Sequence, residues 1–349
     1  MPRLVTAGCM AVRCSLLAYL NSVYNAVGSG LRLCCGVSLV HLPSCDEVTS
    51  VRTDLARLVK ALKAQKPPKW IWQKPFDYDP SHFKRLCSLN GAEPAGTDLV
   101  DYANDMRYEQ SPLQPDLFRY LMPICMDVWH KDLLANGRSR YGGFVEHFWA
   151  ALAEHTVLGH LNQSEYDEVQ TFMTAALLDR IDRENRLEFS GMGASPYTWF
   201  YALGSFCVVF PALPPLWKIW WEMTTPGQAC AGLQYLSCLL YENYRNPIFA
   251  PWTPVGGGGP PALWEIEGHI YEHGWRAENV AYVKATLTTA YIEDRLRCAA
   301  RTLKDVVQSP VPQQMLNDFV TQSTLLELRL AELPSLLLES PMGVLDWSV

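Results

Sequence analysis

The chain has 349 residues, of which 49% are hydrophobic and 19% charged, a composition typical of a folded protein with a large core. The formal net charge of −7 disfavours general affinity for nucleic acid or for an anionic membrane surface. The 11 cysteines include no C-x-x-C pair, so the sequence indicates neither a zinc ribbon nor a thioredoxin-type redox site and favours a reducing setting.

The first 45 residues differ from the rest of the chain. They contain three arginines, no aspartate or glutamate, and five of the 11 cysteines. An acid-free start of this kind also occurs in organelle transit peptides. We therefore expect residues 1–45 to be a poorly ordered or removable segment of a cytoplasmic protein, with organelle targeting as the alternative.

Helical patterns follow this segment. Residues Ser44 to Glu47 fit a capping box, in which the serine hydroxyl accepts from a free backbone N–H and the glutamate reaches back. Several later helices are expected to begin at a proline that follows a polar residue, where the missing N–H costs nothing. The expected helices lie near residues 46–65, 80–89, 97–109, 115–135, 143–160, 164–185, 196–210, 214–223, 226–243, 261–273, 277–307 and 312–332.

Signals for β-structure are sparse. No Asn-Gly or Asp-Gly turn joins alternating segments, and β-branched runs are short. We predict a mainly α fold, an irregular stack of antiparallel helix pairs of bundle or HEAT-like character, with about 11–12 helices and little or no β-structure. A single helical domain is expected over residues 46–340, with two lobes meeting near residue 190 as a variant, followed by a tail at 341–349.

Basic residues are scattered along the chain. The densest patch runs from Lys66 to Lys69 around Pro67 and Pro68. We interpret this patch as a solvated linker rather than a binding site, and we expect no nucleic-acid partner.

A charge-poor block extends from Phe189 to Trp264. It holds only four charged side chains and six of the 12 tryptophans. Prolines at 196, 211, 214 and 215 divide its first part into helices shorter than the roughly 20 apolar residues that span a bilayer. We predict a buried helical hairpin without a transmembrane span, with a ligand or partner groove and membrane contact as alternatives.

A possible metal-binding pattern lies just beyond this block. His269 and His273 stand four residues apart on one helical face, as ligands of a single Zn²⁺ can, and Glu272 could act as the catalytic base for a bound water. Over these five residues the pattern H-x-x-E-H resembles the inverzincin metalloprotease signature. That family carries its motif on an α/β domain, and we do not assign the chain to it.

The same residues have a structural interpretation, which we favour. The motif ends at Gly274, and a histidine in the last turn of a helix is stabilised by the helix dipole. Glu265, four residues before His269, can also pair with it. We therefore expect no cofactor, with zinc as the alternative.

The functional expectation is a non-catalytic helical binding or scaffold protein. Its protein partner or small molecule would contact aromatic residues of the charge-poor block or of its Gly/Pro loop, because tryptophan is frequent in binding hot spots. A metal-dependent hydrolase centred on His269, Glu272 and His273 is one alternative, and a small-ligand receptor with a tryptophan-lined pocket is another. The expected contact residues are Trp217, Trp220, Trp221, Phe249, Trp252 and Trp264.

Overall fold

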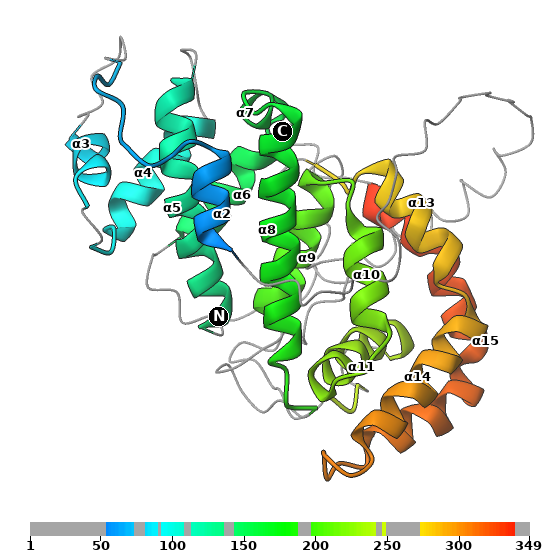
Figure 1. Ribbon diagram of the computed structural model, residues 1–349. Helices are drawn as coiled ribbons and strands as arrows, with labels where there is room; N and C mark the ends of the chain where they lie inside the picture. Colours follow the sequence, from blue (N-terminus) through cyan, green and yellow to red (C-terminus); the bar gives the residue numbers. More distant parts are fainter. Residues whose placement is uncertain are drawn as a thin grey trace, which may run out of the picture. The chain divides into compact units, whose positions relative to one another are not determined.

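The structure is a computed structural model that describes residues 54–72, 81–89, 92–107, 113–135, 143–187, 197–241, 246–248 and 273–338. The chain divides into two compact units, Met1–Thr49 and Ser50–Val349, and all described residues belong to the second. Every regular element among them is a helix and none is a β-strand, which confirms the predicted mainly α fold (Figure 1). The predicted segments 1–45 and 341–349 lie outside the described residues.

The described helices are numbered in chain order. In order they are α2 (Leu55–Ala61), α3 (Ser81–Cys87), α4 (Gly96–Arg107), α5 (Pro115–Leu134), α6 (Phe144–Ala153), α7 (His155–Leu158), α8 (Gln163–Asp182), α9 (Tyr197–Val209), α10 (Leu213–Trp221), α11 (Pro226–Leu240), α13 (Ala277–Thr286), α14 (Thr289–Leu303) and α15 (Val311–Leu338).

Local capping explains several helix starts. Asn162 and Glu165 form a reciprocal capping box at the start of α8, with each side chain bonded to the other residue's backbone N–H. Thr225 accepts from the Gln228 N–H at the start of α11, where Pro226 occupies the first helical position. These starts lie close to the predicted ones.

The predicted helix 46–65 is interrupted at Asp54 and ends before residue 65, while its first part, residues 46–53, lies outside the described residues. Asp54 has a non-helical backbone and its side chain accepts from the Arg57 N–H at 2.9 Å, so α2 begins at Leu55. The helix ends at Ala61, and Lys63 then takes a left-handed backbone with φ 55°. The cap at Asp54 and the turn at Lys63 therefore make α2 shorter than its hydrophobic spacing alone predicts.

Other boundaries also differ from prediction. The predicted helix 277–307 divides into α13 and α14 because Thr288 caps the second, its hydroxyl accepting from the Tyr291 N–H. The predicted helix 143–160 divides at Glu154 into α6 and α7. By contrast, α15 continues past the predicted end at 332 and includes Pro334.

Helix α8 lies within the helical packing. It contacts α2 and α5 from earlier in the chain and α9, α10 and α11 from later in it. The last two helices, α14 and α15, run beside one another, and both pack on α11 (Figure 1). None of the described helices combines the length and apolarity needed to cross a membrane, in agreement with the prediction.

The C-terminal helices supply polar groups to the charge-poor helices α9, α10 and α11. Arg276 donates to the carbonyls of Val208 and Val209 at the end of α9. Arginines of α14 and α15 do the same for the next two helices: Arg295 donates to Trp221 O, and Arg329 to Leu239 O. Because the last carbonyls of a helix lack partners within it, these arginines stabilise all three helix ends.

Asn279 of α13 completes this arrangement. Its side chain is fully buried, accepts from the Leu213 N–H at 3.1 Å and donates to Cys207 O and Phe210 O at 2.9 and 2.7 Å. One amide therefore satisfies the end of α9 and the start of α10 together. The charge-poor block is thus covered, over its described helices, by other parts of the same chain.

Candidate functional site

The three predicted contact residues of α10 lie in the hydrophobic core. The exposed fractions of Trp217, Trp220 and Trp221 are 0%, 0% and 1%. Trp217 and Trp221 stack with ring centroids 4.3 Å apart, and Trp220 meets Trp199 edge to face at 5.3 Å. The structure therefore corrects the expectation of an exposed surface at these three positions, because apolar neighbours already cover them.

The same burial argues against a tryptophan-lined pocket at α10. The indole N–H groups of Trp220 and Trp221 have no hydrogen-bond acceptor within the described part of the chain. The exposed fractions of these two residues, 0% and 1%, leave no space for a water molecule or a ligand beside the indole rings. Trp220 instead meets Trp199 and Tyr235 in edge-to-face contacts, with ring centroids 5.3 and 5.4 Å apart.

A buried polar network lies between α8 and α11. The Gln234 amide donates to Glu184 Oε2 at 2.7 Å and to Arg186 O at 2.9 Å, and Glu184 pairs with buried Arg180. Burial, with Glu184 nearby, raises the pKa of the Cys230 thiol to about 12. Cys230 is therefore a protonated thiol at neutral pH and a poor nucleophile.

The histidine motif is only partly described. His269 and Glu272 lie outside the described residues, as do Phe249, Trp252 and Trp264, while His273 is half-buried. The chain after His273 is held against the end of α15: Trp275 N–H donates to Leu337 O at 2.7 Å. No group of three or more metal-capable side chains occurs in the part of the chain that the structure describes. The predicted zinc site and its Glu272 base stay predictions.

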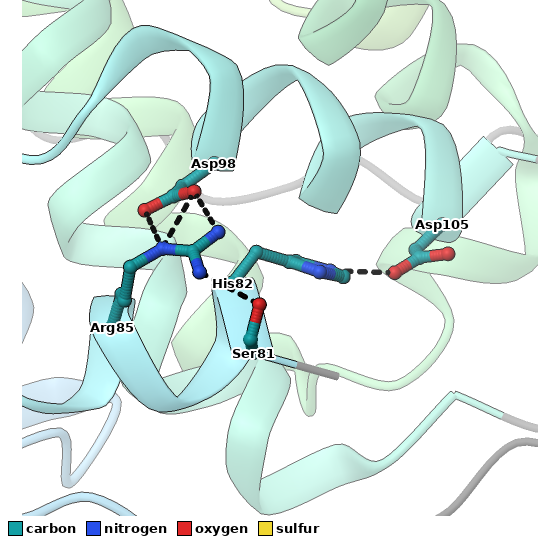
Figure 2. Close-up of polar contacts among 5 residues, drawn as sticks. All are labelled: Ser81, His82, Arg85, Asp98 and Asp105. Carbon is teal, nitrogen blue, oxygen red and sulfur yellow. Dashed lines mark hydrogen bonds and ion pairs between the residues drawn. The ribbon is translucent and has the colours of Figure 1, made fainter. Parts of the chain in front are cut away.

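A second histidine belongs to the interface of α3 and α4. Figure 2 shows His82 directed at Asp105, with Nε2 and Oδ2 2.9 Å apart, and Arg85 bonded to both carboxylate oxygens of Asp98. Ser81 Oγ accepts from Arg85 at 2.7 Å, so this contact places a cation on the serine hydroxyl. These contacts hold α3 on α4, and nucleophilic catalysis needs a base in place of that cation.

Two other tryptophans lie on the surface. Trp70 is 65% exposed and Trp72 is 38% exposed, while Ile71 between them packs against the core. The buried Gln114 side chain joins their backbones: its Nε2 donates to Trp70 O at 2.8 Å, and its Oε1 accepts from the Trp72 N–H at 2.9 Å. One side-chain amide, placed directly before α5, thus fixes the backbone that presents both rings.

The chain that leads to these tryptophans is basic. Arg57, Lys60, Lys63, Lys66 and Lys69 recur at every third position, and residues 55–72 contain no acidic residue. All five side chains are exposed. We call residues 60–72 the basic-aromatic segment.

Nearby carboxylates engage only part of this charge. Arg57 pairs with Glu168 of α8 at 2.5 Å. Burial alone would raise the pKa of Glu165, but hydrogen bonds from Arg119 and the Asn162 N–H, with Lys63 nearby, hold that pKa below its ordinary value. The carboxylate of Glu165 is therefore already engaged within α5 and α8.

Sequence reasoning located the basic patch but not the tryptophans beside it. The interpretation of Lys66 to Lys69 as a solvated linker agrees with the exposure of these lysines. It omitted Trp70 and Trp72, which follow the patch directly and were visible in the sequence. The Gln114 contact was not visible, because it joins residues 42 and 44 positions apart.

Comparisons with protein-family models, curated proteins and solved structures found no match to this chain.

Proposed function

We propose that this chain is a non-catalytic helical binding or scaffold protein that contacts a protein partner through the basic-aromatic segment. The observation that carries the proposal is the pair of exposed tryptophans, Trp70 and Trp72, on a backbone fixed by buried Gln114. Tryptophan is among the residues most often found in binding hot spots, because one ring buries a large apolar area on association.

The segment is organised before binding. Ile71 anchors it to the core, Gln114 holds the backbone on either side of Ile71, and Pro67 and Pro68 restrict the chain before it. A partner would therefore lose less affinity to ordering this segment than to ordering a free loop. The proposed partner contact therefore uses Trp70 and Trp72 in place of the buried tryptophans of α10.

The other expected functions stand as separate hypotheses. A hydrolase centred on His269, Glu272 and His273 is tested by metal analysis of the purified protein beside the His269→Ala variant. Metal that is bound by the wild type and lost from the variant would favour it. The loop residues Phe249, Trp252 and Trp264 could extend the partner contact, and single alanine variants in the same binding measurement would test this.

A photo-crosslinking amino acid at position 72 tests the proposed function. The same amino acid at Val320 serves as the control, since Val320 is 74% exposed on α15, outside the segment. We expect a specific protein to crosslink at position 72 and not at 320. After identification and purification, it should bind the Trp70→Ala/Trp72→Ala variant about 30-fold more weakly than the wild type.

Two results would overturn the proposal. One is a lack of any specific product at position 72. The other is a purified partner that binds the double variant as tightly as the wild type. Because exposed substitutions change stability little, unchanged thermal unfolding would show that the double variant is still folded.

A further inference from the structure

The charge of the basic-aromatic segment contrasts with that of the whole chain. The chain carries −7, whereas residues 60–72 carry four cations and no acid, and Arg57 lies just before them. Arg57 is paired with Glu168, and Lys63 lies near the engaged Glu165. Within the described part of the chain, Lys60, Lys66 and Lys69 are in no ion pair. Three cations beside two exposed tryptophans are therefore available to a partner.

The carboxylate of Asp116 does not remove this excess. Asp116 is exposed in the first turn of α5, two residues after Gln114. Its Oδ1 accepts from the Leu117 N–H at 3.0 Å, at the helix end where the dipole favours an anion. Even with this carboxylate counted against one lysine, two cations remain without a counter-charge.

We infer that the basic-aromatic segment binds an acidic segment of the partner protein that also carries apolar side chains. This inference rests on the proposed function and names the chemistry of its partner. The carboxylates would approach Lys60, Lys66 and Lys69 while apolar side chains cover Trp70 and Trp72. Complementary charge speeds encounter and fixes the register of binding, and the aromatic rings provide the buried area.

The observations favour this partner over an anionic polymer or a membrane. Interactions between exposed charges fade beyond about 8 Å at physiological salt, so a short acidic segment experiences mainly the local cations. A nucleic acid or a vesicle is large enough to meet the rest of a chain with net charge −7. The three available cations are also lysines, whereas bidentate phosphate recognition favours arginine.

The test uses the purified full-length chain and a fluorescently labelled short peptide in which Asp and Glu alternate with Leu and Phe. Binding is followed by anisotropy while salt rises from about 50 to about 300 mM. We expect affinity to fall with salt. Lys66→Glu/Lys69→Glu should weaken binding at least about tenfold, and Trp70→Ala/Trp72→Ala about 30-fold. Lys284→Glu, an exposed lysine on α13, is the matched control and should bind as the wild type does.

Failure of this inference is distinguishable from failure of the proposed function. If the acidic peptide does not bind, or binds the lysine double variant as well as the wild type, the inference is wrong. Binding of phosphatidylserine vesicles or of an oligonucleotide through these residues, without peptide binding, would also overturn it. In each case a partner crosslinked at position 72 would leave the proposed function standing.

Discussion

Two groups of tryptophans occupy opposite environments in this protein. Trp217, Trp220 and Trp221 are enclosed by other rings on a charge-poor helix, whereas Trp70 and Trp72 are exposed beside lysines. The sequence predicted a buried hairpin for the charge-poor block but also placed the expected contact residues there, and it gave no role to Trp70 and Trp72. The polar partners of a charge-poor segment can therefore be supplied by residues from elsewhere in the chain.

The arginines of the C-terminal helices explain the difference. Arg276, Arg295 and Arg329 donate to the last carbonyls of α9, α10 and α11, so these helices need few charges of their own. The basic-aromatic segment instead bonds to the buried Gln114 side chain and keeps its charges in water. In this protein the charge-poor helices thus form part of the core, and the exposed tryptophans lie beside basic residues.

The largest expected effect on stability comes from removing the buried ring of Trp220. Trp220→Ala should destabilise the protein by about 3–5 kcal/mol, because it removes buried apolar contacts and leaves a cavity. The matched Trp70→Ala should change stability by no more than about 0.5 kcal/mol. Urea unfolding of both variants measures this difference, and equal effects would break the comparison.

The next largest effect on stability is expected at Asn279, whose side chain bonds to the backbones of α9 and α10. Asn279→Ala removes three buried hydrogen bonds and should cost about 2–4 kcal/mol of unfolding free energy. Asn317→Ala, at an exposed position of α15, is the control, with an expected change below about 0.5 kcal/mol. A loss for Asn279→Ala as small as that of the control would mean that α9 and α10 do not depend on this amide.

A smaller effect is expected for the arginines. Arg295→Gln removes the charged donor to Trp221 O and should cost about 1–2 kcal/mol. Arg297→Gln breaks only an exposed pair with Glu293 on the same helix and should cost about 0.5 kcal/mol or less. If the two variants unfold at the same urea concentration, carbonyl capping by arginine does not stabilise the charge-poor block.

The smallest effect is a dependence of folding stability on pH through Glu165, near the basic-aromatic segment. The pKa of Glu165 lies below its ordinary value, so its charged form stabilises the fold above the unfolded-state pKa of about 4.3. This contribution is lost as pH falls from there through the lower folded-state pKa. The stability gap between the wild type and Glu165→Gln should be constant at neutral pH and close on acidification. A gap that does not change with pH would contradict the role of this carboxylate.

Much of the fold could be predicted because its signals are local. Proline after a polar residue located the starts of α5 and α11, and hydrophobic spacing located the helices between them. The misses arise where one short-range hydrogen bond ends a longer pattern, as at Asp54 and Thr288. Hydrophobic periodicity carries no information about such a bond.

The candidate site was less predictable for a different reason. Burial of Trp220 depends on rings from α9 and α11, and placement of Trp72 depends on Gln114, all distant in sequence. Composition reports how apolar a segment is, and tertiary contacts decide whether its rings meet water. The exposed pair could still have been proposed from two tryptophans that follow a basic, proline-containing run.

Oxidation of tryptophans in the native protein, mapped by mass spectrometry of its peptides, tests the division of the rings most directly. The account predicts that Trp70 and Trp72 are oxidised first and that the acidic peptide protects them. Trp217, Trp220 and Trp221 should react only after unfolding. Rapid oxidation of the α10 tryptophans in the native state, with Trp70 and Trp72 protected, would contradict it.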